Sequence, residues 1–352
     1  MNFWGGSEMS ELWNPWEISE RIFPKKGKPS DKLRYLLNYA VLAPSGHNSQ
    51  PWLFKIVGEE VELYADRTRA LAVCDPEDRE LVMACGAALF NLRVALRHFD
   101  YEGKVKTFPD KNEPDLLARV GFGGKRKPTA EDDSLFHAIA QRHTNRMPFE
   151  PREVPEKVLS KLKAAANKED AWLHFVLGES GRNKVADLVA EGDNIQMANA
   201  PFRRELAAWM HRNRDVSHDG MPGFALGLGG VTSTLAPLIV RTFDFGKGQA
   251  AKDRQLATGS PVLAVLGSAA NAPENWLSTG QALERVLLSA RAEEVWASFL
   301  NQPIEVPELL PRLREILGVR GFPQLLLRLG YGPDVKPTPR KTAGEVLMRP
   351  LR

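Results

Sequence analysis

Apolar residues recur at helical spacing in several stretches of the chain. Leucines at positions 33, 36 and 37 share one face of a helix predicted over 30–42, with Ser30 as its N-cap and Pro44 just beyond its end. A second apolar stripe predicts a long helix over 75–99, with Pro76 in its first turn. A third helix is predicted over 155–166.

Strands are predicted where β-branched and aromatic residues cluster between turn residues. The stretches "WLFKIVG" (52–58) and "VELYADR" (61–67) indicate two strands around a turn at Gly58. Shorter strands are expected near Val105 and over 117–122. Helices and short strands therefore alternate through the first third of the chain.

The second half repeats this pattern. In "AWLHFVLG", Trp172 and Gly178 have the spacing of Trp52 and Gly58, and "STGQALERVLLSA" (278–290) parallels "MACGAALFNLRVAL" (83–96). With two visible copies, this similarity indicates a duplicated unit and not a solenoid. We therefore expect an N-terminal arm over 1–29, a first copy over 30–130 and a second copy over 131–352.

The two copies differ by one long insertion. Trp52 and Gly86 are 34 positions apart, whereas Trp172 and Gly280 are 108 apart, so about 74 residues are added in the second copy. The insertion is expected at about 180–258 and contains the glycine-rich, apolar stretch "DGMPGFALGLGGVTS". Such a composition is typical of a loop that closes over a ligand.

Composition excludes several classes of protein. The 47 basic and 44 acidic residues are interleaved and give a net charge of only +3, which does not favour nucleic-acid binding. Two cysteines are too few for a disulfide scaffold and suit a reducing compartment. The first residues lack a signal-peptide pattern, and the most apolar stretch is broken by glycines and a proline. We expect a cytoplasmic protein without membrane or nucleic-acid partners.

A polar junction, "APSGHNSQPW" (43–52), connects the first predicted helix to the first strand. It offers hydroxyl, imidazole, amide and backbone groups at one point, so a binding role is one hypothesis. The alternative is a well-bonded helix stop and turn, for which these residue types are common. The second copy has "AAANKEDAW" at this place, so the junction occurs once.

A second candidate site is "RHTNRMPF" (142–149). On an extended backbone, Arg142, Thr144 and Arg146 point the same way and would form a clamp for a dianion. The alternative is a solvated basic turn. Near the C-terminus, Arg340 and Lys341 add a basic pair. No phosphate-loop, GxSxG or zinc-ligand pattern is present, and we expect no metal site.

Together these motifs resemble the flavin-dependent nitroreductase family. That family has an R-x-[ST]-x-[RK] clamp for the flavin phosphate, a P-S-x-x-N-x-Q-P-W junction that reaches the flavin from a partner subunit, and a C-terminal basic pair. The resemblance implies FMN as cofactor. It implies cofactor-binding roles for Pro44, Ser45, Gly46, His47, Asn48, Gln50, Arg142, Thr144, Arg146, Arg340 and Lys341.

The division of these motifs between the copies resembles the tandem, lidded (Acg-like) branch of the superfamily. The junction lies in the first copy, whereas the clamp and basic pair lie in the second. A fused dimer with one surviving composite site would have this arrangement. The resemblance implies an α+β fold, with a nitroreductase-like unit duplicated as a pseudo-dimer and antiparallel-dominated sheets packed by helices.

The expected function is NAD(P)H-dependent two-electron reduction of nitroaromatics or quinones, without a catalytic side chain because the flavin carries the chemistry. The alternative is a non-catalytic flavin-storage protein in which the insertion covers the FMN. The choice of NADH or NADPH stays open. So does the choice between a monomer acting as a pseudo-dimer and a further homodimer.

Overall fold

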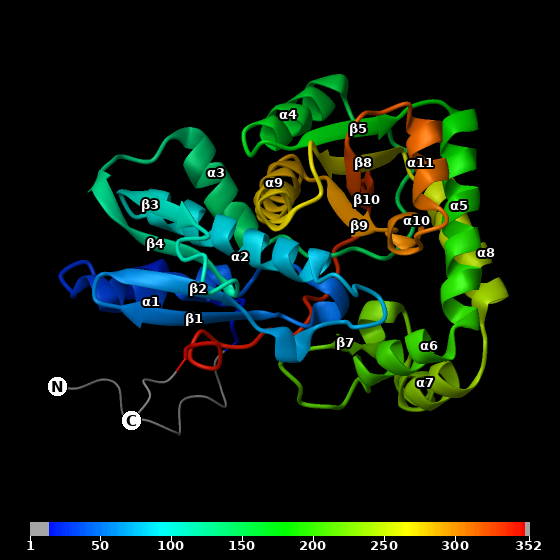
Figure 1. Cartoon of the computed structure of the whole chain (residues 1–352), viewed down its shortest axis with the longest axis horizontal. Coiled ribbons are helices and arrows are strands. Elements are labelled where there is room, and N and C mark those ends of the chain that lie inside the picture. Colours follow the sequence, from blue (N-terminus) through cyan, green and yellow to red (C-terminus); the bar gives the residue numbers. More distant parts are fainter. Residues whose placement is uncertain (1–13, 349–352) are drawn as a thin grey trace.

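The computed structural model describes residues 14–348, which form two four-stranded antiparallel sheets flanked by helices (Figure 1). The first sheet has the order β1-β2-β4-β3 and the second the order β5-β8-β10-β9. The strands of the first are β1 (Trp52–Val57), β2 (Glu60–Ala65), β3 (Tyr101–Thr107) and β4 (Leu116–Lys125). Those of the second are β5 (Trp172–Val176), β8 (Val262–Ser268), β9 (Trp296–Phe299) and β10 (Phe322–Gly330).

The two sheets have the same topology, because β1, β2, β3 and β4 correspond in chain order and position to β5, β8, β9 and β10. Each also has a helix before its first strand and a long helix between its second and third. The helices outside the insertion are α1 (Pro29–Ala40), α2 (Arg79–His98), α3 (Ala130–Ile139), α4 (Glu156–Asn167), α9 (Pro273–Arg291), α10 (Gln302–Glu305) and α11 (Leu310–Leu317). The predicted duplicated α+β fold is thus confirmed.

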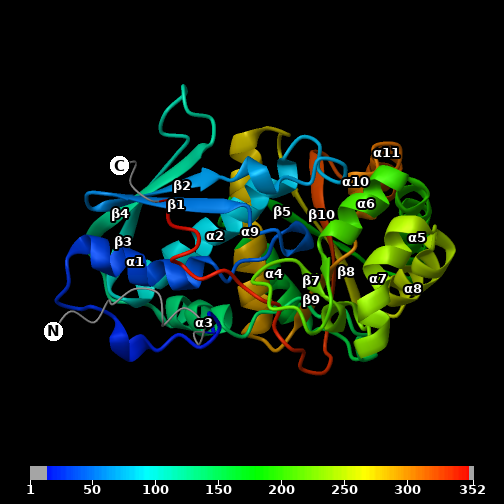
Figure 2. The ribbon, with the colours of Figure 1, turned by 90° about the horizontal axis from the view of Figure 1, so that it is seen from below.

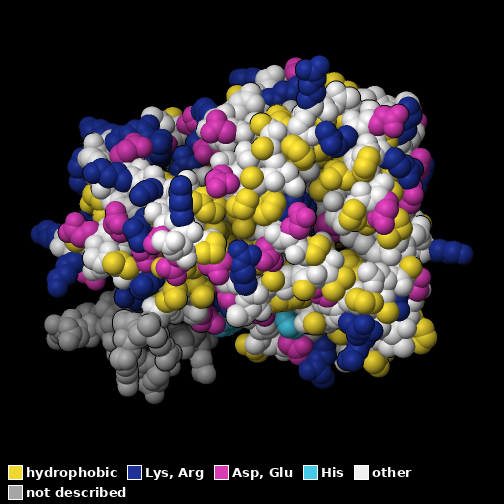
Figure 3. All heavy atoms as spheres, in the orientation of Figure 1, with side chains coloured by type: hydrophobic (Ala, Val, Ile, Leu, Met, Phe, Trp, Pro, Cys, Tyr) yellow, Lys and Arg dark blue, Asp and Glu magenta, His cyan; other side chains and the backbone are white. Residues whose placement is uncertain are grey.

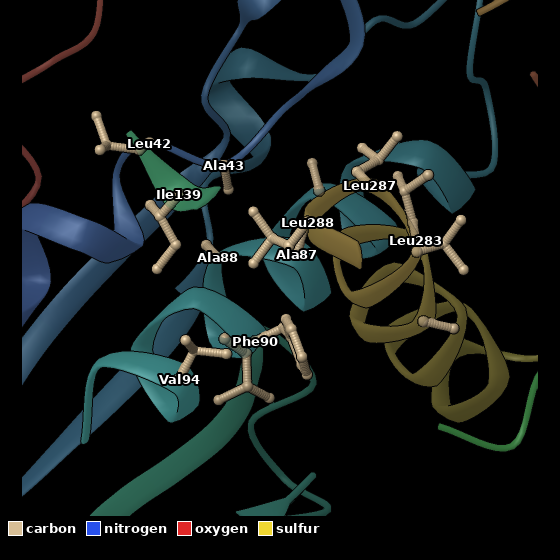
Figure 4. Close-up of a cluster of buried hydrophobic side chains, with 14 of the residues drawn as sticks. Leu42, Ala43, Ala87, Ala88, Phe90, Val94, Ile139, Leu283, Leu287 and Leu288 are labelled. Carbon is tan, nitrogen blue, oxygen red and sulfur yellow. The ribbon is translucent and has the colours of Figure 1, made fainter. Parts of the chain in front are cut away.

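The long helices α2 and α9 pack against each other between the sheets (Figure 4). They touch at the two glycines that the sequence repeat pairs. A Cβ on Gly280 would lie 2.0 Å from the Met83 carbonyl oxygen, and one on Gly86 would lie 2.3 Å from the Leu277 carbonyl oxygen. Larger residues would force the helices apart, so glycine permits this close crossing. One apolar core runs from α1 through both helices to β10.

The insertion is a mostly helical unit between β5 and β8, visible as the green to yellow end of the molecule in Figure 2. We call residues 179–258 the lid. It consists of α5 (Glu179–Ala198), α6 (Ala200–Ala208), β6 (Met210–His211), β7 (Met221–Pro222), η4 (Gly223–Leu226), α7 (Gly230–Thr242) and α8 (Gly246–Thr258). The glycine-rich stretch expected as a loop is partly helical. Its Leu226 and Leu228 pack on Met210 and Met221, which stabilises the turns.

Two predicted helix boundaries are shifted. The first helix begins at Pro29 with Lys28 as N-cap, in place of Ser30. The second begins at Arg79, because Asp78 adopts a left-handed conformation with φ 56° that interrupts a helix from Asp75. The predicted domain limits at 29/30 and 130/131 stay predictions, and residues 1–13 of the arm lie outside the described part.

Candidate functional site

The polar junction is a tight turn between α1 and β1. It contains a short 3-10 segment, η2 (Gly46–Asn48), and its residues His47, Asn48 and Gln50 have φ values of 50°, 57° and 52°. Left-handed backbone is unfavourable for non-glycine residues and persists where the surroundings enforce it. Here the Ser45 hydroxyl accepts a hydrogen bond from the Gln50 backbone nitrogen (2.9 Å). The turn is thus held from within.

The predicted clamp is an extended segment beside the edge strand β9. The backbone nitrogen of Asn145 donates to the Ala297 carbonyl (3.0 Å), and Thr144 forms a parallel bridge with Ala297. Arg142 reaches back to the first half, where its Nη2 donates to the Leu42 carbonyl (2.9 Å), two residues before Pro44. The junction and the start of the clamp therefore meet, although 100 positions separate Arg142 from Leu42.

Arg340 contacts the same junction from the C-terminal segment, which is the red coil that crosses between the halves in Figure 2. Its Nη1 donates to the Asn48 side-chain oxygen (2.7 Å). Its guanidinium also lies 5.0 Å from the ring centroid of Trp16, whose indole nitrogen donates to the Thr338 carbonyl (2.9 Å). The N-terminal arm thus forms part of the wall of this site.

The buried charges at this point are unbalanced. Arg142 and Arg340 are 4% and 5% exposed, and Glu284 on α9 is fully buried with a carboxylate oxygen 3.4 Å from the Arg142 Nε. Within residues 14–348, neither guanidinium Nε atom and neither Glu284 oxygen has a hydrogen-bond partner. Burial raises the pKa of Glu284 to about 7, although Arg142 and Arg340 oppose this. A partly protonated carboxyl cannot neutralise two guanidiniums, so the site favours an anion.

Two histidines beside the arginines are neutral near pH 7. Burial, assisted by Arg146, lowers the pKa of His47 to about 4. Burial, assisted by Arg142 and Arg340, lowers the pKa of His143 to about 3. His47 Nε2 is buried without a hydrogen-bond partner among the described residues. Each ring therefore offers one donor and one acceptor, and no charge, to a ligand.

Not all of the predicted residues converge. Arg146 lies between the junction and the lid: it contributes to the lowered pKa of His47, and its Nη1 donates to the Ala225 carbonyl of the lid at 3.5 Å. The backbone nitrogen of Lys341 donates to the Gln50 side chain (2.9 Å). Burial and the like charge of Arg69 lower the pKa of the Lys341 ammonium, and Asp219 opposes this. Arg340 therefore binds the junction through its side chain, whereas Lys341 binds it through its backbone.

The junction amides bind protein groups. The Asn48 amide nitrogen donates to the Gly220 (2.9 Å) and Pro339 (3.0 Å) carbonyls, and the Gln50 amide nitrogen donates to the His218 carbonyl (2.8 Å). These contacts attach the lid and the C-terminal segment to the junction. An ion pair between Arg69 and Asp219 reinforces them.

The structure encloses one small cavity beside the clamp. Arg142, His143 and Thr144 line it together with Trp296, and its volume is about 10 Å³, roughly the space of one water molecule. This pocket by itself is too small for a nucleotide. Ser45 and Gly46 lie next to this region and are partly exposed, while Pro44 is buried.

Sequence reasoning missed Glu284, Trp16 and Arg69 as parts of this site. The sequence does contain a hint of Glu284, because it is an acidic residue among the apolar positions of the repeated helical stretch over 278–290. Trp16 belongs to a tryptophan-rich arm whose partner was not predictable. Arg69 left no signal.

Comparisons with known proteins identify the family of this chain. The model of the Nitroreductase family matches residues 139–331. A putative NAD(P)H nitroreductase of Mycobacterium tuberculosis strain H37Rv is 30% identical over 327 residues, which is 91% of this chain and 92% of the relative. The putative NAD(P)H nitroreductase acg of the same strain is 27% identical over 324 residues, or 90% and 95%. The chain belongs to the nitroreductase family.

Among solved structures, the FMN and NADPH-dependent nitroreductase NfnB of a Sphingopyxis strain superposes with a TM-score of 0.42 and 20% identity. The match covers 61% of this chain and 98% of that one. The NfnB structure of Mycobacterium smegmatis, in complex with NADPH, has a TM-score of 0.40 and 18% identity, covering 62% and 99%.

Proposed function

We propose that the chain is an FMN-dependent NAD(P)H oxidoreductase with one composite site, acting on small acceptors such as nitroaromatics or quinones. The observation that carries this proposal is the meeting of two buried guanidiniums from the second half, Arg142 and Arg340, with the polar junction of the first half. Relatives named as putative NAD(P)H nitroreductases over nine-tenths of the chain support it.

The donor chemistry of the site fits FMN. The phosphate would bind at Arg142 and Arg340, whose Nε atoms have no hydrogen-bond partner among residues 14–348, with Thr144 as a further donor. Ser45, Gly46 and His47 would line the ring. Charge-assisted hydrogen bonds contribute about 1.5–3 kcal/mol each, and a micromolar complex needs about 8 kcal/mol. Three such bonds with ring burial reach that range.

When bound, FMN supplies hydride acceptance from a reduced nicotinamide and electron delivery to the acceptor. This chain's residues would fix the phosphate, orient the ring against the junction and exclude water. The neutral imidazole of His47 would offer a hydrogen bond without adding charge. Asn48 and Gln50 would hold the lid in place and not contact the ring, which refines the family-based expectation for these two residues.

Anaerobic reduction tests the proposal directly. The holoprotein should lose its flavin absorbance within seconds of NADH or NADPH addition and regain it when a quinone is added under argon. The measurement is stopped-flow absorbance of purified holoprotein, with free FMN and the same nucleotide as control. A holoprotein that stays yellow over hours with both nucleotides would contradict the enzyme assignment.

Flavin storage is the second candidate, and the lid contacts favour it. Residues His218 and Gly220 lie directly on Gln50 and Asn48, so the lid covers the junction. A lid that stays closed would exclude nicotinamide and substrate alike. In that case the holoprotein would resist reduction but would release FMN slowly on dilution, as followed by the recovery of flavin fluorescence.

Glu284→Gln should change how FMN affinity depends on pH. In the protein without ligand, the pKa of Glu284 is about 7. A bound dianion would raise this pKa further, so the complex would hold the Glu284 proton more tightly than the ligand-free protein does. Wild-type affinity should therefore fall as pH rises from 7 to 9, by about fivefold if the pKa rises by about one unit. Glu284→Gln has no proton to lose and should show no such fall, with tighter binding at pH 9.

The measurement is FMN fluorescence quenching at pH 7, 8 and 9. The phosphate of FMN is already a dianion over this range, since its second pKa is about 6. Glu169→Gln is the control, because Glu169 is also buried and pairs with arginines (Arg93 and Arg285), but these lie outside the site. Equal pH slopes in wild type and Glu284→Gln would refute the coupling.

A further inference from the structure

The outer face of α7 in the lid is apolar and exposed. Val231, Leu235 and Leu238, spaced to lie along one side of the helix, are 80%, 50% and 66% exposed. Phe243 and Phe245 follow at 59% and 47%. A helix in a globular protein ordinarily turns such residues inward. In α7 the inward side is formed by Ser233 and Ala236 instead.

Exposed large hydrophobic residues are concentrated in the part of the lid around α7. Fourteen large hydrophobic residues are exposed in the described part of the chain, and six of them lie between Val216 and Phe245. Val216, in the loop before β7, is 95% exposed. The side chain of Asn213 in the same loop bonds to Leu228 and Phe224, just before α7. The apolar residues therefore belong to one end of the lid.

The exposed charges around this end are almost all basic. Arg241 lies in the last turn of α7, and Lys247 opens α8. From α6 to α8, the exposed cations for which no ion pair is found within residues 14–348 are Arg204, Arg214, Arg241, Lys247 and Lys252. Among the described residues from α6 to α8, Asp244 is the one acidic residue that is exposed. Figure 3 shows basic and hydrophobic side chains together at the lower right, where Figure 1 has α6 and α7.

We propose that this α7 face, formed by Val216, Val231, Leu235, Leu238, Phe243 and Phe245 with its basic surround, docks the protein on an anionic lipid bilayer. An interfacial helix combines an apolar face with flanking lysine and arginine, and lies in the plane of the headgroups. Exposed cations near an anionic leaflet each strengthen binding.

Charge decides between this partner and a second copy of the chain. Two α7 faces pressed together would bring the same cations into contact, with Asp244 as the exposed carboxylate that α6 to α8 offer within the described residues to offset them. An anionic bilayer offers the opposite charge to all of them and an apolar layer beneath. Membrane attachment was not expected from the sequence, because its most apolar stretch is broken by glycines and a proline. Helix α2 (Arg79–His98) is long and apolar enough to span a membrane, but it is 83% buried inside the protein. Docking through one exposed face requires no spanning helix, and it does not depend on flavin binding.

The test is co-sedimentation of the full chain with vesicles of phosphatidylglycerol and phosphatidylcholine in equal parts, against vesicles of phosphatidylcholine alone. Wild type should bind the anionic vesicles at least tenfold better, and 0.5 M NaCl should weaken the binding. Leu235→Asp with Leu238→Asp should abolish it. Arg241→Ala should weaken it about fivefold, from about 1 kcal/mol per cation. All variants are first checked by thermal melting.

Ile22→Asp is the matched control, because Ile22 is 63% exposed but lies in η1 (Glu20–Ile22), outside the lid. It should bind the anionic vesicles as wild type does. Absence of wild-type binding to anionic vesicles would overturn the proposal. So would binding that Leu235→Asp with Leu238→Asp leaves intact. A concentration-dependent dimer in light scattering that this variant abolishes, with no vesicle binding, would assign the face to a second copy instead.

Discussion

Arg142→Ala protein is expected to bind FMN at least tenfold and up to about a hundredfold more weakly than wild type. The guanidinium would make one charge-assisted hydrogen bond to the phosphate from its Nε, and such a bond contributes about 1.5–3 kcal/mol. Because Arg142 is 4% exposed and its Nε has no hydrogen-bond partner in the described chain, the ligand would restore a bond that the protein does not satisfy.

Affinity would be measured by titrating apoprotein with FMN and following flavin fluorescence. Arg93→Ala is the control, because Arg93 is also a largely buried arginine of the helical interface but pairs with Glu169. Its loss should lower stability without changing FMN affinity. Arg142→Ala protein that purifies with full flavin occupancy would show that the phosphate binds elsewhere.

Riboflavin binding by wild type and by Arg142→Ala distinguishes a direct contact of Arg142 with the phosphate from a structural role in holding the junction. Riboflavin lacks the phosphate, so wild type and variant should bind it equally if Arg142 acts on the phosphate. An equal loss for both ligands would instead indicate that the variant disturbs the junction through its lost contact with the Leu42 carbonyl.

Gly280→Ala is expected to destabilise the whole molecule by about 3 kcal/mol or more, the upper range for overpacking a core. The added Cβ would lie 2.0 Å from the carbonyl oxygen and 2.7 Å from the carbonyl carbon of Met83. Both are backbone atoms of α2, so rotamer changes cannot relieve the contact. The helices would have to separate, which would loosen the shared core and the site between the halves.

Chemical denaturation followed by circular dichroism measures this effect. Gly248→Ala is the control, because Gly248 also lies in a helix but an added Cβ there would meet no atom within 4 Å. That substitution should stabilise the protein slightly, by up to about 1 kcal/mol, since alanine favours helix over glycine. Equal stability of Gly280→Ala and wild type would mean that α2 and α9 do not cross at these glycines.

The two candidate functions, reductase and flavin storage, differ in how often the lid opens. The same contacts, from Asn48 and Gln50 to Gly220 and His218, would hold a reductase closed between turnovers or a storage protein closed throughout. Release of these contacts requires breaking three hydrogen bonds to buried groups and the Arg69–Asp219 ion pair. The rate of flavin reduction by nicotinamide therefore reports directly on how often the lid opens.

The local pattern of the sequence determined most of the elements and their repetition. The periods of apolar residues identified α1, α4, β1 and β2 to within two residues, because secondary structure follows local side-chain spacing. The difference between the two spacings from tryptophan to glycine predicted an insertion at about 180–258, and its limits stay a prediction; the structure has the helices α5 to α8 between β5 and β8. The repeat also paired Gly86 with Gly280, but only the structure shows that these glycines lie where α2 and α9 cross.

Only the tertiary structure decided which side chains remain available to a ligand. The sequence placed Asn48 and Gln50 in one group with Arg142, but in the fold their side-chain amides bond to the lid and the C-terminal segment. The contact between Arg340 and Asn48 joins residues 292 positions apart, and local spacing carries no information about such distant partners. The same holds for Glu284 beside Arg142, for Trp16 over Arg340 and for the outward turn of α7, because each depends on how separate elements pack.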